Sequence, residues 1–305
     1  MTRLPQIGWL ADGRRLHLQD GPIDLIVEAR GAPAMVRIAY EAAIRRFTGL
    51  LDELCEELPA LRQAARPDAC HVKGLVARRM YEAVAPFAGN CFITPMAAVA
   101  GAVAEEILGA MVGAADLDRA YVNNGGDLAL HLGDGQHFKV GLVDRPDEPT
   151  LFGKTSVAAD DATRGVATSG WRGRSFSLGI ADAVTVLAFT AAQADAAATI
   201  IANAVDLPHH PAVSRCPAND IQPDSDLGAR LVTRDVGLLS STEIAAALEA
   251  GAFCVRQLVA AGLIHGAALY LQGETRVVAL KNIGQKPDVS SRSLVRSKTE
   301  SLMHA

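Results

Sequence analysis

Three short segments of the sequence combine polar side chains with small, flexible residues. The first, NNGGD at residues 123–127, interrupts two apolar runs. Its two glycines permit backbone conformations that other residues avoid, and they remove side chains that would keep a ligand from the main chain. The N–H groups exposed in such a loop can bind an anion. Because Asn-Gly is also the strongest short hairpin signal, an ordinary turn is an equally good interpretation.

The second segment, VATSG at residues 166–170, ends an apolar run with the hydroxyls of Thr168 and Ser169 and with Gly170. Two hydroxyls beside a glycine can form an anion-binding loop. The same composition is common where ordinary strands end, so the segment alone favours a turn.

The third segment places Asp195 and Thr199 four residues apart, on one face of a helix. Their neighbours on that side are apolar, so the carboxylate borders the buried side and needs a partner. Magnesium suits it, since this ion prefers oxygen ligands and often takes one or two carboxylates plus substrate phosphates. Alternatively, Asp195 favours the helix N-terminus electrostatically and Thr199 bonds to a carbonyl one turn earlier. The spacing alone favours this second interpretation.

Hydrophobic periodicity predicts the elements that must position these segments. Two alternating runs around an Asp-Gly-Pro turn predict a hairpin over residues 14–29. Thr94 before Pro95 predicts the N-cap of a long, buried helix. Period-two runs predict strands in the middle of the chain. Further helices are expected over residues 34–61, 72–84, 190–205 and 241–263, and late strands over 266–271 and 276–280.

Strands in hairpin order interleaved with helices indicate an α+β or mixed α/β fold rather than a doubly wound sheet. No G-x-G-x-x-G follows an expected strand, so the sequence gives little support to a Rossmann or P-loop site. We expect a single domain over residues 1–280 and a polar, flexible tail over residues 281–305.

Composition excludes several classes of protein. The formal net charge is -5 with 21% charged residues, which leaves no basic footprint for nucleic acid or for a membrane surface. The first residues contain no secretory signal, and no uninterrupted run of about 18 apolar residues predicts a membrane span. Five scattered cysteines without a C-x-x-C pair indicate a reducing compartment. We therefore expect a cytoplasmic protein that binds neither nucleic acid nor a membrane.

The order of VNNGGDLAL, GVATSG, DAVTVLAF and AAQADAAAT along the chain resembles the ApbE family of flavin transferases. TPMAAVAGAVAE at residues 94–105 and ADAAATIIAN at residues 194–203 are similar to its cytosolic UPF0280 branch. The resemblance covers roughly residues 15–280, and the ordered set is more specific than any single motif. It implies a T-fold-like α+β domain with mixed, largely antiparallel sheets and flanking alanine-rich helices.

ApbE enzymes are magnesium-dependent FAD:protein FMN transferases, which cleave the FAD pyrophosphate and attach FMN to a threonine or serine of a target protein. The resemblance thus implies a flavin nucleotide and an acceptor protein as partners. It assigns Asp195 and Thr199 to the magnesium ligands. It assigns these residues to the nucleotide pocket: Asn124, Gly125, Gly126, Asp127, Thr168, Ser169 and Gly170.

Two family motifs are altered in this sequence. The family's G-G-I-A-K-G segment aligns with residues 97–101, and its lysine position falls on Ala100. The family's H-I-I-D-P-x-T-G motif is replaced by WRGRSFSLGIADA, in which Arg172 or Arg174 either supplies charge to a phosphate or is a solvated turn residue. Two further interpretations therefore stay open: a flavin-binding protein that has lost transfer chemistry, and an interaction protein whose helices form a homo-oligomer interface.

Overall fold

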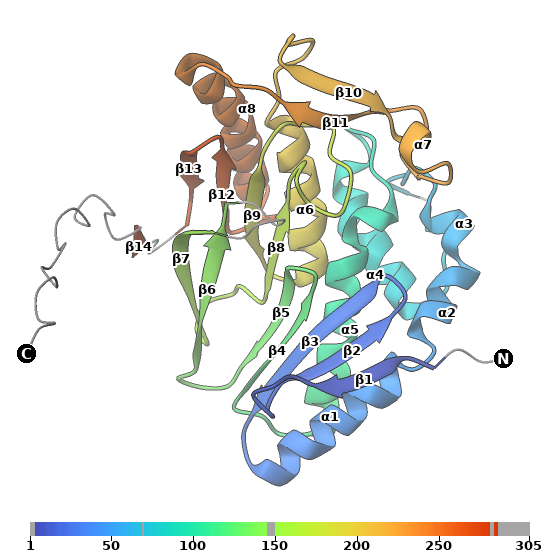
Figure 1. Ribbon diagram of the computed structural model, residues 1–305. Coiled ribbons are helices and arrows are strands. Elements are labelled where there is room, and N and C mark those ends of the chain that lie inside the picture. Colours follow the sequence, from blue (N-terminus) through green and yellow to red (C-terminus); the bar gives the residue numbers. More distant parts are fainter. Residues whose placement is uncertain (1–3, 69, 145–149, 281–283, 286–305) are drawn as a thin grey trace, which may run out of the picture.

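A central antiparallel sheet organises the molecule (Figure 1). The computed structural model describes residues 4–68, 70–144, 150–280 and 284–285. Within these ranges the sheet has nine strands in the order β1-β2-β3-β4-β5-β8-β9-β12-β13, and each pairs antiparallel with its neighbours. The strands are β1 (Gln6–Trp9), β2 (Leu16–Asp20), β3 (Ile23–Arg30), β4 (Arg119–Asn124), β5 (Asp127–Leu132), β8 (Gly165–Ser169), β9 (Ala183–Ala188), β12 (Gly266–Leu271) and β13 (Glu274–Val278).

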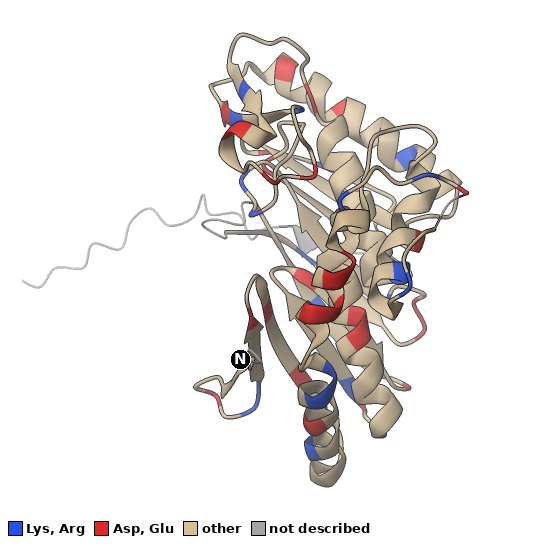
Figure 2. Cartoon of the chain, turned by 90° about the vertical axis from the view of Figure 1, so that its right-hand side faces the viewer, with Lys and Arg blue, Asp and Glu red and all other residues tan. Residues whose placement is uncertain are grey.

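Of the five longer helices, α1, α5, α6 and α8 contact one face of this sheet, and α4 packs against α5 and α6. Residues of both charge signs are distributed over this helical side (Figure 2). α5 packs on β4 and β5, α6 on β8 and β9, and α8 on β12 and β13. The fold is therefore α+β with antiparallel sheets and flanking helices, as predicted. The five helices are α1 (Pro33–Phe47), α4 (Leu75–Val84), α5 (Val99–Ala114), α6 (Ala191–Ala204) and α8 (Ser241–Ala260).

Smaller elements complete the two sides. β6 (His137–Val143), β7 (Leu151–Ala158) and β14 (Gly284–Gln285) form a second sheet, and β10 (Val213–Pro217) pairs with β11 (Leu231–Val236). Apart from Gly284–Gln285, the predicted tail at 281–305 lies outside the described residues. The short helices are α2 (Leu50–Glu56), α3 (Leu58–Leu61), α7 (Ala218–Ile221), η1 (Ala85–Phe87) and η2 (Pro95–Ala98).

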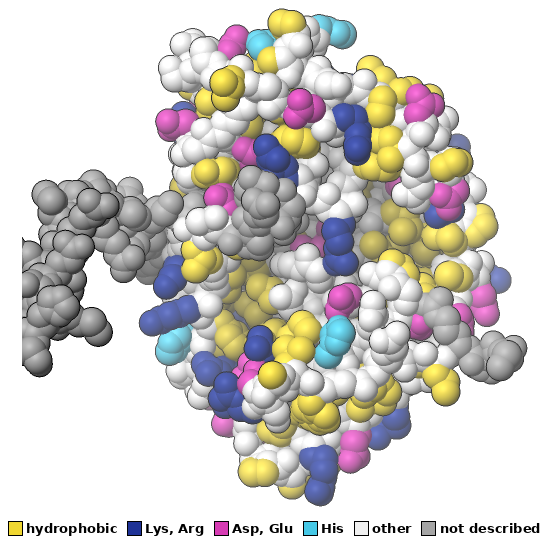
Figure 3. All heavy atoms as spheres, viewed as in Figure 1, with side chains coloured by type: hydrophobic (Ala, Val, Ile, Leu, Met, Phe, Trp, Pro, Cys, Tyr) yellow, Lys and Arg dark blue, Asp and Glu magenta, His cyan; other side chains and the backbone are white. Residues whose placement is uncertain are grey.

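Strand alternation separates two hydrophobic clusters on opposite faces of the central sheet. On β5, Ala129 belongs to the main core beneath the helices, whereas Leu130 belongs to a smaller cluster. Val140 of β6 and Val157 of β7 complete that smaller cluster. Because neighbouring side chains of a strand point to opposite faces, β6 and β7 cover the sheet face that the helices leave open. Basic, acidic and hydrophobic side chains are mixed on the molecular face seen in Figure 3.

Local chemistry explains where the helices begin and end. The hydroxyl of Thr190 caps α6, and Ser240 with Glu243 forms a capping box at the start of α8. The helix predicted over residues 34–61 is broken, because Gly49 adopts a left-handed conformation (φ 86°) that ends the helical path between α1 and α2. Thr94 occupies the predicted N-cap position before Pro95, but its hydroxyl donates to Asp226 and makes no capping hydrogen bond.

The stretch Pro95–Ala114, which comprises η2 and α5, is long and apolar enough to cross a membrane. In this fold it contacts the sheet, α1, α4 and α6. Val103, Ile107 and Met111 are completely buried in the core. Its apolar composition is thus explained by packing inside the domain.

α5 and α6 approach each other closely at Gly101. A Cβ atom at this position would overlap the backbone carbonyl of Ala191, which no side-chain rotation can relieve. We therefore expect Gly101→Ala to lower the free energy of unfolding by about 2–3 kcal/mol. Gly109→Ala on the same helix meets nothing within 4 Å and should raise it by about 0.5–1 kcal/mol. Urea unfolding of both variants tests this, and equal effects would contradict the close approach.

Candidate functional site

The NNGGD segment forms the hairpin turn between β4 and β5. Asn124 pairs with Asp127, and Gly125 and Gly126 connect them with φ angles of 64° and 119°. The N–H of Gly126 donates to the side chain of Asn123 at 2.8 Å. The turn interpretation is therefore confirmed. The glycines are required by the left-handed backbone, which a side chain would strain.

The same turn is anchored to two other parts of the chain. The Nδ2 of Asn124 donates to the carbonyl of Ala100 at 3.2 Å. The Oδ1 of Asp127 accepts from the N–H of Thr168 on β8 at 3.1 Å. Both side chains are buried, with 6% and 8% of their surface exposed. The polar groups of the turn thus point into the protein, toward the start of α5 and the end of β8.

Asp195 reaches the same place from α6. Its Oδ2 accepts from the N–H of Gly101 at 3.0 Å, next to the carbonyl that Asn124 contacts. The residue is partly buried, as its place beside the apolar stripe of the helix predicts. Thr199, one turn further along α6, is also partly exposed, and its hydroxyl has no hydrogen-bond partner among the described residues. The predicted carboxylate and the NNGGD turn therefore meet at residues 100–101.

The two carboxyl groups disfavour each other's ionisation. Burial raises the pKa of Asp127 to about 7, although the N–H of Thr168 and the charge of Arg174 act in the opposite direction. Burial also raises the pKa of Asp195, and the charge of Asp127 raises it further. Two ionised carboxylates this close need a cation or a shared proton.

Arg174 belongs to this site, and Arg172 does not. A Cβ atom at Gly125 would overlap the guanidinium of Arg174, so this group lies directly against the turn. The Nε of Arg172 instead donates to Asp182 at 2.9 Å, while its guanidinium stacks over Trp171 at 4.3 Å from the ring centre. Arg172 is thus held in a structural contact, whereas Arg174 offers a positive charge beside the turn glycines.

The VATSG segment contributes mainly through its backbone. The hydroxyl of Thr168 is bonded to the hydroxyl of Thr185 on β9 at 2.9 Å. Ser169 is partly exposed, and Gly170 is buried where a Cβ atom would overlap the carbonyl of Asp182. Gly170 therefore serves the close packing of two segments, and contact of this loop with a nucleotide stays a prediction.

The oxygen atoms gathered here fit magnesium better than zinc. Asp195 and Asp127 offer two carboxylates that act on each other's ionisation, and Thr199 as a further oxygen ligand stays a prediction. No group of three or more His, Cys, Asp or Glu side chains suited to a metal occurs in the part of the chain that the structure describes. Magnesium, which prefers oxygen and keeps several waters, tolerates such a sparse set.

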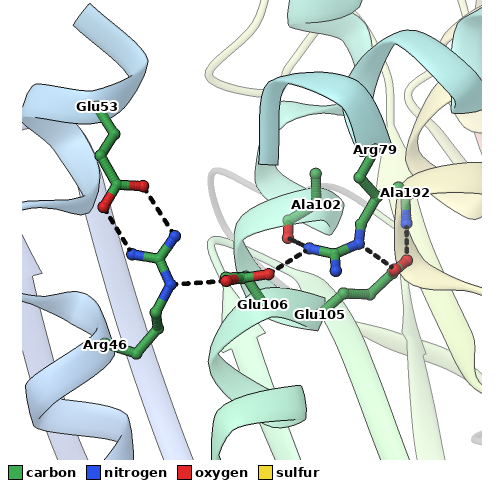
Figure 4. Close-up of polar contacts among 7 residues, drawn as sticks. All are labelled: Arg46, Glu53, Arg79, Ala102, Glu105, Glu106 and Ala192. Atoms are coloured by element: carbon green, nitrogen blue, oxygen red, sulfur yellow. Dashed lines mark hydrogen bonds and ion pairs between the residues drawn. The ribbon is translucent and has the colours of Figure 1, made fainter. Parts of the chain in front are cut away.

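An ion-pair network that sequence analysis missed holds the helix of Asp195 in place (Figure 4). The Oε1 of Glu105 accepts from the N–H of Ala192 in the first turn of α6 at 2.7 Å. The other oxygen of Glu105 lies 3.2 Å from the Nε of Arg79 on α4. α6 is therefore fixed to α5 twice, by this contact and by the bond from Gly101 to Asp195.

The network continues from Glu106 toward α1. Glu106 accepts from Arg79 at 2.9 Å and from Arg46 at 2.6 Å, and Arg46 also makes a two-bond contact with Glu53 (Figure 4). These arginines lower the pKa of Glu106 against the effect of burial. The sequence signal was present, since Glu105 and Glu106 are the only charges within α5.

Glu105→Ala is expected to lower the free energy of unfolding by about 1–2 kcal/mol, because the N–H of Ala192 loses its partner and Arg79 loses one of its two carboxylates. The matched control is Glu82→Ala on α4, an exposed position that should change stability by less than about 0.5 kcal/mol. Urea unfolding measures both. Equal values for the two variants would contradict the role given to Glu105.

Comparison with known proteins identifies the family of this chain. Residues 7–277 match the family model described as "AbpE bacteria". A UPF0280 protein of Methanopyrus kandleri is 40% identical over 128 residues, which cover 42% of this chain and 48% of the relative, so the match spans about half of that protein. A UPF0280 protein of Methanosphaerula palustris is 37% identical over 182 residues, covering 56% of this chain and 70% of the relative.

Among solved structures, the apo form of the flavinyl transferase ApbE of Pseudomonas stutzeri matches with a TM-score of 0.47 and 12% identity, over 90% of this chain and 94% of that chain. The family model covers nearly the whole described domain, and the archaeal relatives carry the UPF0280 name. The chain therefore belongs to the ApbE-like family and is similar to its UPF0280 members.

Proposed function

We propose that this protein is an ApbE-like enzyme that binds a flavin nucleotide with magnesium and acts on its pyrophosphate, by cleaving FAD or by transferring FMN from FAD to a hydroxyl of an acceptor protein. The observation that carries the proposal is the meeting of Asp195, Asp127 and the double-glycine turn around residues 100–101. Family membership supports the same chemistry.

In this proposal the acidic and basic residues of the site have different roles. Asp195 and Thr199 would hold magnesium. The bound ion would neutralise charge that develops on the pyrophosphate. Arg174, beside Gly125, would bind phosphate oxygens, because a guanidinium matches two phosphate oxygens at once.

Asp127 has a separate part in this proposal. Its pKa near 7 allows its carboxyl group to hold or release a proton at neutral pH, as a group that assists an attacking hydroxyl must. The turn between β4 and β5 keeps that carboxyl group buried. Because bulk water does not solvate its ionised form there, its pKa stays above the ordinary value.

Arg174 also supplies a positive charge that one of the altered family motifs lacks. The family's lysine position falls on Ala100, so the positive charge expected there is missing. Arg174 brings a guanidinium to the turn from another segment of the chain. We infer that it replaces the lysine in binding the nucleotide.

A second candidate function is a flavin-binding protein without transfer chemistry. Alanine at the family's lysine position and the replaced histidine motif favour this second function, because both changes remove reactive groups but keep the residues of the pocket. In either case we expect a cytoplasmic protein.

The test is incubation of the purified protein with FAD and magnesium, followed by mass spectrometry for released AMP and for protein that carries FMN. A parallel sample with a chelator is the control. AMP release that needs magnesium supports the enzyme. Intact FAD that stays bound supports the binding protein. If no flavin nucleotide raises the melting temperature, both proposals fail, since a ligand that binds only the folded state must stabilise it.

A further inference from the structure

A cavity of about 560 Å³ lies between the N-terminal hairpin and α1, away from the carboxylate site. It is lined by residues of β1, of the β1–β2 turn, of the end of β3 and of α1, which lie together at the bottom of Figure 1. Arg30 lines the cavity and pairs with Arg119, the first residue of β4. Asn124, which belongs to the carboxylate site, is the last residue of the same strand. Five residue steps along a strand separate the two places by roughly 17 Å.

The wall of this cavity is held by aromatic and backbone contacts. The rings of Trp9 and Tyr40 meet edge to face, with centroids 5.3 Å apart. The hydroxyl of Tyr40 donates to the carbonyl of Arg14 at 2.7 Å and accepts from the N–H of Ala29 at 3.1 Å. Tyr40 therefore joins α1 to the β1–β2 turn and to β3. The cavity is formed before any ligand binds, as small-molecule sites usually are.

Positive charge gathers in this cavity although the chain as a whole is acidic. Arg14, Arg30 and Arg37 line it, against the single carboxylate of Glu41. Arg30 is neutralised by Glu28 at 2.7 Å. Arg14 and Arg37 are exposed and have no ion-pair partner among the described residues. Two guanidinium groups are thus available to a bound anion.

The N-terminal end of α1 has the same polarity. Pro33, at the first position of this 15-residue helix, lines the cavity. The first turn carries no acidic residue, and no side chain caps it. The partial positive charge of the helix N-terminus therefore adds to that of the arginines.

We propose that this cavity binds a small organic anion, with its phosphate or carboxylate held by Arg14 and Arg37 and its flat apolar body against Trp9 and Tyr40. The volume lies in the usual range for small-molecule sites, roughly 300–1,000 Å³. Guanidinium groups bind both oxyanions through paired hydrogen bonds and also stack on flat rings. The site is separate from the flavin site proposed above and does not depend on it.

The experiment measures binding of 1-naphthyl phosphate and 1-naphthoate to the full chain by ligand-observed NMR, without FAD or magnesium. Saturable binding of one or both probes is expected, and the stronger probe identifies the anionic group. Neutral 1-naphthol should bind at least about ten-fold more weakly, because it forms no charge-assisted hydrogen bond. Equal binding of 1-naphthol, or no binding of either anion, would overturn the proposal.

Variants locate the binding. Arg14→Gln with Arg37→Gln should weaken the anionic probe by at least about ten-fold, whereas Arg45→Gln, an exposed change on α1 outside the cavity, should not. Asp195→Asn should also bind the probe normally, which separates this site from the carboxylate site. The placement would be refuted if Asp195→Asn lost probe binding, or if the double variant bound the probe as tightly as the wild-type chain. Circular dichroism confirms that each variant is folded.

Discussion

Asp195→Asn is expected to reduce magnesium-dependent release of AMP from FAD by at least about 100-fold, since even the outer partners of a metal site contribute about 10–100-fold. Asparagine has nearly the same shape and still accepts the bond from Gly101, so the helix keeps its position. What disappears is the negative charge that would hold the ion. The measurement is the initial rate of AMP release at several magnesium concentrations.

The same substitution should not destabilise the metal-free protein at neutral pH. Burial and the charge of Asp127 both disfavour the ionised form of Asp195, so a neutral amide removes an unfavourable interaction. Unfolding by urea should give an equal or higher free energy than the wild-type chain. Asp235→Asn, at an exposed position on β11, is the matched control. It should change neither the rate of AMP release nor the free energy of unfolding. Unchanged turnover in Asp195→Asn would remove the role proposed for it.

Local signals in the sequence predicted much of this fold. The hairpin over residues 14–29 follows from alternation and an Asp-Gly-Pro turn, and it appears as β2 and β3. α6 begins directly after its N-cap residue Thr190. α8 begins after Ser240, which forms a capping box with Glu243. Each of these depends on contacts within a few residues, which the order of residue types records directly.

Long-range pairing was not predictable in the same way. β10 and β11 are separated by 13 residues that include α7, so no short hairpin turn joins them. The break near Gly49 was missed because apolar spacing continues across it, whereas Thr48 is extended and Gly49 is left-handed in the structure. Thr94 has the right residue type for a cap, but Asp226, 132 residues away, takes its hydroxyl.

The candidate site shows the same limit. The spacing of Asp195 and Thr199 predicted a shared helical face, yet the partner of Asp195 is a backbone N–H 94 residues away. The raised pKa of Asp127 needs burial, and that of Asp195 needs burial and the charge of Asp127, which no local pattern contains. The residues around the N-terminal cavity gave no signal, because an arginine, a tryptophan or a tyrosine is individually ordinary and only folding brings them together.

Magnesium is expected to stabilise the folded protein strongly at pH 8 and weakly at pH 5. The pKa of Asp127 is raised from 3.8 to about 7 in the folded state, and that of Asp195 is raised too. The folded state therefore binds protons more tightly than the unfolded state, and the free energy of unfolding falls as pH rises from about 4 to 7. With about 1.4 kcal/mol per pKa unit, Asp127 alone contributes a fall on the order of 3–4 kcal/mol. Above pH 7 the ionised carboxylates can bind the cation, which restores stability.

The measurement is urea unfolding at pH 5 and pH 8, with magnesium and with a chelator. Burial lowers the pKa of His265, which makes stability rise with pH near 6 and so opposes the effect of Asp127. Comparison with Asp127→Asn removes this contribution, because both chains contain the same histidine. The low pKa of Glu243, about 2, reduces stability as pH falls toward 4, and the same comparison removes this contribution because both chains contain Glu243. The wild-type chain should lose more stability than Asp127→Asn between pH 4 and 7. Identical pH profiles would mean that Asp127 titrates as an ordinary exposed carboxylate, and equal stabilisation by magnesium at both pH values would mean that the ion does not bind these carboxylates.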